Sequence, residues 1–271
     1  MQHAQEPPRE RPRRAIYLLP NLLTTAALLA GFYAVIAALD EQFGNAAIAV
    51  FVAMILDGLD GRVARLTNTS SAFGGEYDSL ADMVSFGVAP ALIVYLWSLQ
   101  SLVGGGHGQL GWVAAFLYVA CTALRLARFN TQIGKADKRF FQGLASPAAA
   151  AVVAGMVWVG HDVGIAGADI AVLALVVTVT SGLLMVSNFA YYSFKDLGGN
   201  KRIPFMALLA LVLIFVFTSI DPPKIILLCF ALYALSGPTW SALRWVRKRR
   251  RGTEASGRDS SGGGDADAGG E

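Results

Sequence analysis

Charged residues are scarce in this sequence: they make up 15% of its 271 residues, whereas 55% are hydrophobic. Soluble proteins have about 25% charged residues, so the composition is typical of an integral membrane protein. Histidine and cysteine are also rare, with three and two residues. Because Cys121 and Cys229 lie in apolar stretches, we interpret them as packing residues and not as a disulfide.

Apolar stretches of membrane-spanning length recur along the chain and predict an all-α, polytopic membrane helix bundle. We expect about eight transmembrane helices, with a range of six to eight because two of the stretches are short. The eight stretches are 16–39, 44–65, 78–99, 110–129, 145–161, 165–188, 204–219 and 224–243.

Lysine and arginine gather in every second connection between the apolar stretches, and this alternation predicts how the chain is oriented in the membrane. Arginines precede the first stretch and a basic run follows the last, so both termini are expected in the cytoplasm. The segments 100–109 and 162–169 contain no lysine or arginine, and Lys224 is the one outward exception. An even number of spans follows, which favours eight over seven. The basic face indicates anionic lipids or an anionic substrate as partner, and no nucleic acid.

Three regions are expected from composition. Residues 1–15 form a basic cytoplasmic segment, 16–245 a membrane domain, and 246–271 a disordered cytoplasmic tail rich in glycine, serine and aspartate. The first apolar stretch is too long for a cleavable signal peptide. We therefore expect an integral protein of a bacterial-type cytoplasmic membrane.

Four aspartates interrupt the apolar sequence: Asp57, Asp60, Asp78 and Asp82. A carboxylate inside a bilayer costs roughly 2.5 to 3.5 kcal/mol on insertion scales, so the group requires a counter-charge. Spacings of three and four residues place each pair on one face of a helix. Two facing pairs form an all-oxygen site, which suits Mg²⁺ or Mn²⁺, whereas Zn²⁺ prefers histidine or cysteine.

Such a site suits chemistry at phosphorus. Four carboxylates can hold two divalent cations roughly 3.5 to 4 Å apart, which stabilises both the attacking and the leaving oxygen. The alternatives are salt bridges to Arg62 and Arg65, or an ion or proton transporter. A transporter would be expected to show inverted repeats or mid-bilayer charges. We see no convincing repeat, and the aspartates lie towards one membrane face.

The residues around the aspartates follow the pattern D-x-x-D-G-x-x-A-R-x8-G-x-x-x-D-x-x-x-D without a mismatch, from Asp57 to Asp82. This pattern resembles the signature of the CDP-alcohol phosphatidyltransferase family. The resemblance implies an enzyme that transfers a phosphatidyl group from a CDP-linked lipid to an alcohol and releases CMP. It also implies a homodimer.

Site roles follow from the same resemblance. Asp57, Asp60 and Asp78 would bind two Mg²⁺ or Mn²⁺ ions, and Asp82 would complete the metal ligands and act as the general base. The expected CDP-lipid contacts are Gly61, Arg65, Asn21 and Thr67. From the residues alone, Gly61 also suits close helix packing, and Arg65 also suits a charge that sets topology.

Further segments resemble the phosphatidylserine synthases of this family, which implies CDP-diacylglycerol and L-serine as substrates. They are Pro20–Thr24, Asp82–Pro90, Ala123–Asn130, Gly143–Ala149 and Leu184–Asn188. The expected serine-binding residues are Arg125, Arg128, Ser146 and Lys195, although cationic residues at cytoplasmic helix ends also serve topology. The alternative acceptors are glycerol 3-phosphate, an inositol phosphate and choline.

Overall fold

The computed structural model describes residues 14–67, 69, 71–105, 109–132, 140–192, 209, 212–213, 216 and 218–259. Its α-helices are α1 (Arg14–Leu39), α2 (Phe43–Leu66), α3 (Ala72–Asp82), α4 (Ala89–Trp97), α5 (Leu110–Gln132), α6 (Ser146–Asp162), α7 (Ala171–Val186) and α9 (Pro222–Asp259). A π-helix, η1 (Met83–Val88), joins α3 to α4, and short 3-10 helices, η2 (Leu99–Gly105) and η3 (Gly167–Ile170), follow α4 and precede α7.

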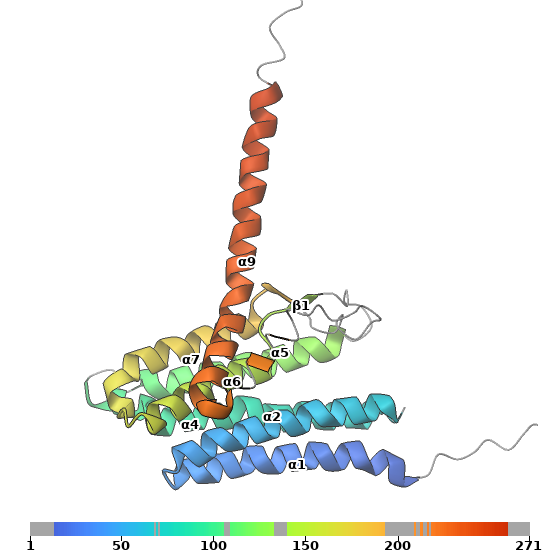
Figure 1. Cartoon of the computed structure of the whole chain (residues 1–271), viewed down its shortest axis with the longest axis vertical. Helices are drawn as coiled ribbons and strands as arrows, with labels where there is room; N and C mark the ends of the chain where they lie inside the picture. The colour runs from blue at the N-terminus through green and yellow to red at the C-terminus, as the bar shows by residue number, and fades with distance from the viewer. Residues whose placement is uncertain are drawn as a thin grey trace, which may run out of the picture.

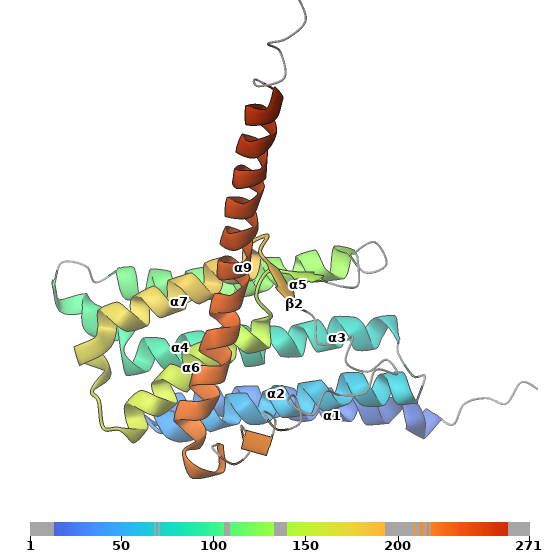
Figure 2. The ribbon, with the colours of Figure 1, turned by 45° about the horizontal axis from the view of Figure 1, so that its top comes forward.

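The helices form one bundle, as the composition predicts. Helices α1 and α2 lie side by side, and α5 and α7 form a second pair (Figure 1). Helices α3 and α4 follow one line through η1 alongside them (Figure 2). A short antiparallel pair of strands, β1 (Phe140–Gln142) and β2 (Ala190–Tyr192), joins the segments that flank α6 and α7. This pair is an addition to the predicted helical fold.

Among the described residues, five helical segments are long and apolar enough to cross a membrane, which supports an integral membrane protein. They are Leu18–Leu39, Ala72–Trp97, Leu110–Thr131, Gly167–Val186 and Pro222–Ser241. Two further predicted stretches form α2, which carries the motif charges, and α6, which has 17 residues. The stretch 204–219 lies mostly outside the described residues. The total of eight spans therefore stays a prediction.

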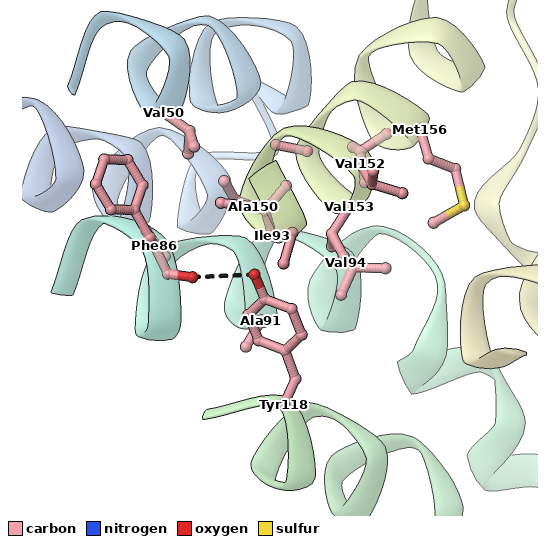
Figure 3. Close-up of a cluster of buried hydrophobic side chains, with 14 of the residues drawn as sticks. Val50, Phe86, Ala91, Ile93, Val94, Tyr118, Ala150, Val152, Val153 and Met156 are labelled. Carbon is pink, nitrogen blue, oxygen red and sulfur yellow. Dashed lines mark hydrogen bonds between the residues drawn. The ribbon is translucent and has the colours of Figure 1, made fainter. Parts of the chain in front are cut away.

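Small residues allow the helices to approach closely, as is common in membrane bundles. Ala34, Ala46 and Ala53 on α1 and α2, and Ala149 on α6, have no exposed surface. Larger side chains fill the space between α2, α4 and α6, among them Val50, Ile93 and Val153 (Figure 3). This core holds α2, which carries Asp57 and Asp60, against α4 and α6.

The π-helix η1 begins directly after Asp82. Neighbouring helices hold it through side-chain hydrogen bonds. The Tyr118 hydroxyl donates to the Phe86 carbonyl at 3.0 Å (Figure 3). The Ser85 hydroxyl donates to the Ala27 carbonyl at 3.1 Å. Short π-helical segments within α-helices occur frequently at functional sites. Here residues of α5 and α1 hold η1 in place, and this also fixes the end of α3.

Helix α9 differs from the expected domain boundary. It lies across the other helices and projects beyond them (Figure 1), and it stays helical to Asp259. The stretch 246–259, expected in a disordered tail, is therefore helical. Arginine, lysine, glutamate and alanine in this stretch are good helix formers, and the glycine and serine content obscured that preference. Residues 260–271 lie outside the described part.

Candidate active site

Three of the four motif aspartates form one cluster. Asp57 and Asp60 on α2 and Asp78 on α3 each bring a carboxylate oxygen to within 4.8 Å of the others. Asp60 is buried, and the other two are half-buried. The Oδ1 atom of Asp78 is buried without a hydrogen-bond partner in the described part of the chain. An unpartnered carboxylate oxygen beside two further carboxylates fits a hard divalent cation.

Asp82 occupies a different position from these three. It is the last residue of α3, and its side chain contacts that of Asp57 while its charge interacts with Arg125. Asp82 lies outside the three-carboxylate cluster. Its expected place among the metal ligands therefore stays a prediction, and its position beside both the cluster and a cation suits a group that handles a proton.

A cleft of about 220 Å³ opens beside Asp60 and Asp78, between α1, α2, α3 and the loop that joins α2 to α3. Three of the four residues expected to contact the CDP-lipid line it, namely Asn21, Gly61 and Arg65. A phosphate bound in this cleft would lie next to the carboxylate cluster and within the reach of an arginine.

Thr67 does not line the cleft. Its hydroxyl donates to the Val63 carbonyl at 2.7 Å and lies 2.6 Å from the hydroxyl oxygen of Thr69. Thr67 therefore closes the last turn of α2, and the buried Thr69 takes the expected place in the cleft wall. No sequence pattern distinguishes these two nearby threonines.

The space around Gly61 bears on its two interpretations. Among the described residues, a Cβ atom at Gly61 would meet only the flexible end of Arg65, with Nη1 at 3.7 Å, and one at Gly58 would meet no atom within 4 Å. Neither glycine is therefore required for helix packing in the described part of the chain. Because Gly61 lines the cleft, its missing side chain leaves room for a ligand.

The connection before Asp78 is shorter than expected. We expected the third apolar stretch to begin at residue 78, but α3 begins at Ala72. Ser71 is its N-cap, and its hydroxyl oxygen accepts a hydrogen bond from the Gly74 amide at 3.0 Å. Gly74 therefore lies in the first helical turn and faces Asn21 across the cleft.

Two of the expected serine-binding residues lie together. Arg125 on α5 donates through Nη1 to the Ser146 hydroxyl at the start of α6, and its Nε atom is buried without a partner in the described part of the chain. The turn before Ser146 depends on Gly143, which has a φ of 81°. A Cβ atom there would lie 2.2 Å from the Met185 carbonyl oxygen, so this turn requires glycine.

Arg128, the third expected serine-binding residue, is not part of this group. Arg128 donates to the side-chain oxygens of Gln142 and Asn188, the latter at 2.8 Å. It thus joins the end of α5 to β1 and to the end of α7. Lys195 lies outside the described residues.

One residue of the site was not identified from the sequence. The hydroxyl of Thr24 on α1 lies 2.6 Å from Oδ2 of Asp60. Thr24 belongs to the Pro20–Thr24 segment that contributed to the family resemblance, but no spacing pattern relates it to a residue 36 positions away.

A bundle of apolar helices with a carboxylate cluster beside a cleft is the arrangement expected of a metal-dependent membrane enzyme. The family model described as CDP-alcohol phosphatidyltransferase matches residues 17–184. The chain belongs to this family.

Individual relatives agree with this assignment. The CDP-diacylglycerol–serine O-phosphatidyltransferase of Helicobacter pylori is 39% identical over 235 residues, which cover 87% of this chain and 94% of that protein. A protein of the same name from Methanocaldococcus jannaschii is 32% identical over 183 residues, covering 68% and 78%. One from Saccharomyces cerevisiae is 36% identical over 154 residues, covering 52% and 53%.

Proposed function

We propose that this protein transfers the phosphatidyl group of CDP-diacylglycerol to the hydroxyl of L-serine, giving phosphatidylserine and CMP. The observation that carries the proposal is the cluster of Asp57, Asp60 and Asp78 beside the cleft that Asn21, Gly61 and Arg65 line. Relatives that share most of this chain carry the name of that activity, which supports serine over glycerol 3-phosphate, an inositol phosphate or choline. Family membership favours an enzyme over a transporter.

The residues of the chain supply the roles that this transfer requires. Two Mg²⁺ or Mn²⁺ ions, when bound to the carboxylates, would offset the pyrophosphate charge and stabilise the leaving CMP. Arg65 binds the phosphates of the donor from the cleft wall. Asp82 accepts the proton of the serine hydroxyl as its oxygen bonds to the phosphorus of the phosphatidyl group and the bond from that phosphorus to CMP breaks.

Arg125 is the best placed residue to bind the carboxylate of serine. A guanidinium group binds a carboxylate through parallel hydrogen bonds, and the buried Nε of Arg125 has no partner in the described residues. Its interaction with Asp82 brings the proposed carboxylate anchor next to the proposed base. Ser146 orients the guanidinium. The two side-chain partners of Arg128 support a role in holding the fold, and Lys195 stays a candidate.

The wider arrangement is also part of the proposal. The active site faces the cytoplasm, both termini lie on that side, and the chain crosses the membrane eight times, because the basic connections alternate as the positive-inside rule requires. A homodimer is proposed on the family resemblance.

The test is CMP release by purified protein in detergent with CDP-diacylglycerol and Mn²⁺. Serine, glycerol 3-phosphate, inositol 3-phosphate and choline are compared as acceptors. Of the four acceptors, we expect only serine to cause CMP release, and we expect phosphatidylserine to appear in the lipid extract. Release with another alcohol in place of serine would replace the acceptor assignment, and release with none would contradict the proposed function.

Replacement of Gly61 by alanine should weaken donor binding about tenfold or more, because a methyl group enters the space that the phosphates occupy. Gly58→Ala is the matched control, since Gly58 is exposed on the same helix and outside the cleft. Each change should stabilise the fold slightly, by about 0.5 to 1 kcal/mol, because glycine is a poor residue inside a helix. Donor affinity and melting temperature measure the two effects, and equal donor affinity in both variants would contradict the proposed contact between Gly61 and the donor.

Arg65→Ala should raise the KM for CDP-diacylglycerol by roughly ten- to a hundredfold, because a charge-assisted contact to phosphate is lost. Arg62→Ala provides the comparison: Arg62 is exposed on the same turn of α2 but does not line the cleft. The KM for serine should stay unchanged in both variants. If the donor KM of Arg65→Ala equals that of Arg62→Ala, Arg65 serves only topology.

A further inference from the structure

Thr24 is a residue of α1 whose side chain contacts the carboxylate cluster. Its side chain is 4% exposed, and Oγ1 lies 2.6 Å from Oδ2 of Asp60 and 3.1 Å from the carbonyl oxygen of Pro20. In the described part of the chain, Thr24 is the only side chain outside the motif whose hydrogen bond to a carboxylate of the cluster is recorded. This contact joins helices that are far apart in the sequence.

The chemistry of a hydroxyl group decides the direction of this bond. A threonine hydroxyl has one proton to donate, and both neighbouring oxygens are acceptors. The contact to the carboxylate is the shorter, and a bond to an ionised acceptor is the stronger kind. Thr24 therefore donates to Asp60, while the Pro20 carbonyl remains a secondary acceptor within the helical turn. A bond of this kind limits the rotation of the Asp60 carboxylate.

We propose that Thr24 is a positioning residue that holds Asp60 in the orientation required for a divalent cation. The inference rests on the proposed function, because it assumes that the cluster binds metal. Residues that hydrogen bond to metal ligands typically change metal affinity by 10- to 100-fold when they are replaced. Thr24 acts through Asp60 and does not need to touch the cation.

The adjacent Thr25 offers a matched control. Its hydroxyl donates to the Asn21 carbonyl at 2.7 Å, in the same back-bonding geometry, and lies 2.9 Å from the hydroxyl oxygen of Tyr77 on α3. It makes no recorded contact with the cluster in the described residues. A change at Thr25 therefore disturbs α1 in a similar way and leaves Asp60 fixed.

The experiment is a titration of purified full-length protein with Mn²⁺, in which electron paramagnetic resonance measures the free ion. We expect Thr24→Val to raise the half-saturating Mn²⁺ concentration by about 10- to 100-fold. Thr24→Ser keeps the hydroxyl and should stay within about threefold of wild type, and Thr25→Val should match wild type. Equal Mn²⁺ binding by Thr24→Val and wild type would overturn the proposal, as would a loss in Thr24→Ser as large as that in Thr24→Val.

Kinetics provide a second measurement that a purely structural role would not change. The Mn²⁺ concentration for half-maximal CMP release should rise in Thr24→Val, while kcat at saturating Mn²⁺ and the KM for serine stay near wild type. A lower kcat with unchanged Mn²⁺ dependence would overturn the positioning role. If valine prevents folding, Thr24→Ala removes the same hydroxyl and carries the same expectation.

These outcomes separate this inference from the proposed function. If wild-type protein binds Mn²⁺ and releases CMP with serine but Thr24→Val behaves identically, the inference alone fails. If wild-type protein neither binds Mn²⁺ nor releases CMP, the proposed function fails and the role of Thr24 fails with it.

Discussion

Replacing Asp78 with asparagine should lower serine-dependent CMP release by on the order of 10²- to 10³-fold, the loss typical when a group that stabilises transition-state charge is removed. The Oδ1 atom of Asp78 is a buried acceptor that lacks a partner in the described residues and lies beside Asp57 and Asp60. Asparagine removes one negative charge and can turn an amide donor towards the cation. Initial rates at saturating donor and serine measure the effect.

The control for this substitution is Asp40→Asn. Asp40 is an exposed aspartate directly after α1 and outside the carboxylate cluster. It should keep wild-type activity and Mn²⁺ binding, whereas Asp78→Asn should lose both. If Asp78→Asn retained more than about a tenth of the wild-type rate, the carboxylate of Asp78 would not be a ligand that the reaction requires.

Asp82→Asn should abolish turnover and leave the affinity for CDP-diacylglycerol largely intact. Removal of a general base typically costs about 10²- to 10⁴-fold in rate, because the attacking hydroxyl then loses its proton acceptor. Asp82 lies outside the cluster of Asp57, Asp60 and Asp78, so the donor site should persist. The kcat and a separate measurement of donor binding distinguish the two effects.

This variant needs a check of folding, because Asp82 also offsets the charge of Arg125. Its melting temperature and its donor binding show whether the protein remains intact. Substantial residual kcat in a folded Asp82→Asn protein would remove Asp82 from the role of base. If Asp82→Asn lost donor and Mn²⁺ binding to the same extent as Asp78→Asn, the main role of Asp82 would be that of a metal ligand.

The carboxylate cluster could be predicted from the sequence because its spacing is a helical property. Side chains three or four residues apart share a helix face, so Asp57 and Asp60 had to project together. Their meeting with Asp78 followed from the short connection between two apolar stretches. Asn21, Gly61 and Arg65 could be named as cleft residues only from the family resemblance. Asn21 in particular lies on α1, and no spacing pattern relates α1 to α2.

Contacts between distant helices could not be predicted in the same way. The bond from Thr24 to Asp60 and the bond from Arg125 to Ser146 depend on how helices pack, and packing in a bilayer follows shape and close approach more than sequence periodicity. The π-helix after Asp82 also escaped prediction, because its residues belong to the same predicted apolar stretch as the α-helix that follows it.

Helix ends were the least predictable feature of the fold. The start of α3 at Ala72 depends on the cap that Ser71 provides, and hydropathy alone does not detect a helix cap. Similarly, α9 continues beyond the apolar segment because its basic residues favour a helix. Hydropathy therefore indicates where apolar helices lie and not where they end.

The most direct test of metal-dependent phosphatidyl transfer is serine-dependent CMP release before and after chelation of divalent cations. Purified protein is treated with EDTA, assayed with CDP-diacylglycerol and serine, and then titrated with Mn²⁺. We expect release to stop after chelation and to return with Mn²⁺ in the wild type and in Asp40→Asn, but not in Asp78→Asn. CMP release that continues at the full rate after chelation would contradict the assignment of the aspartate cluster as a metal site.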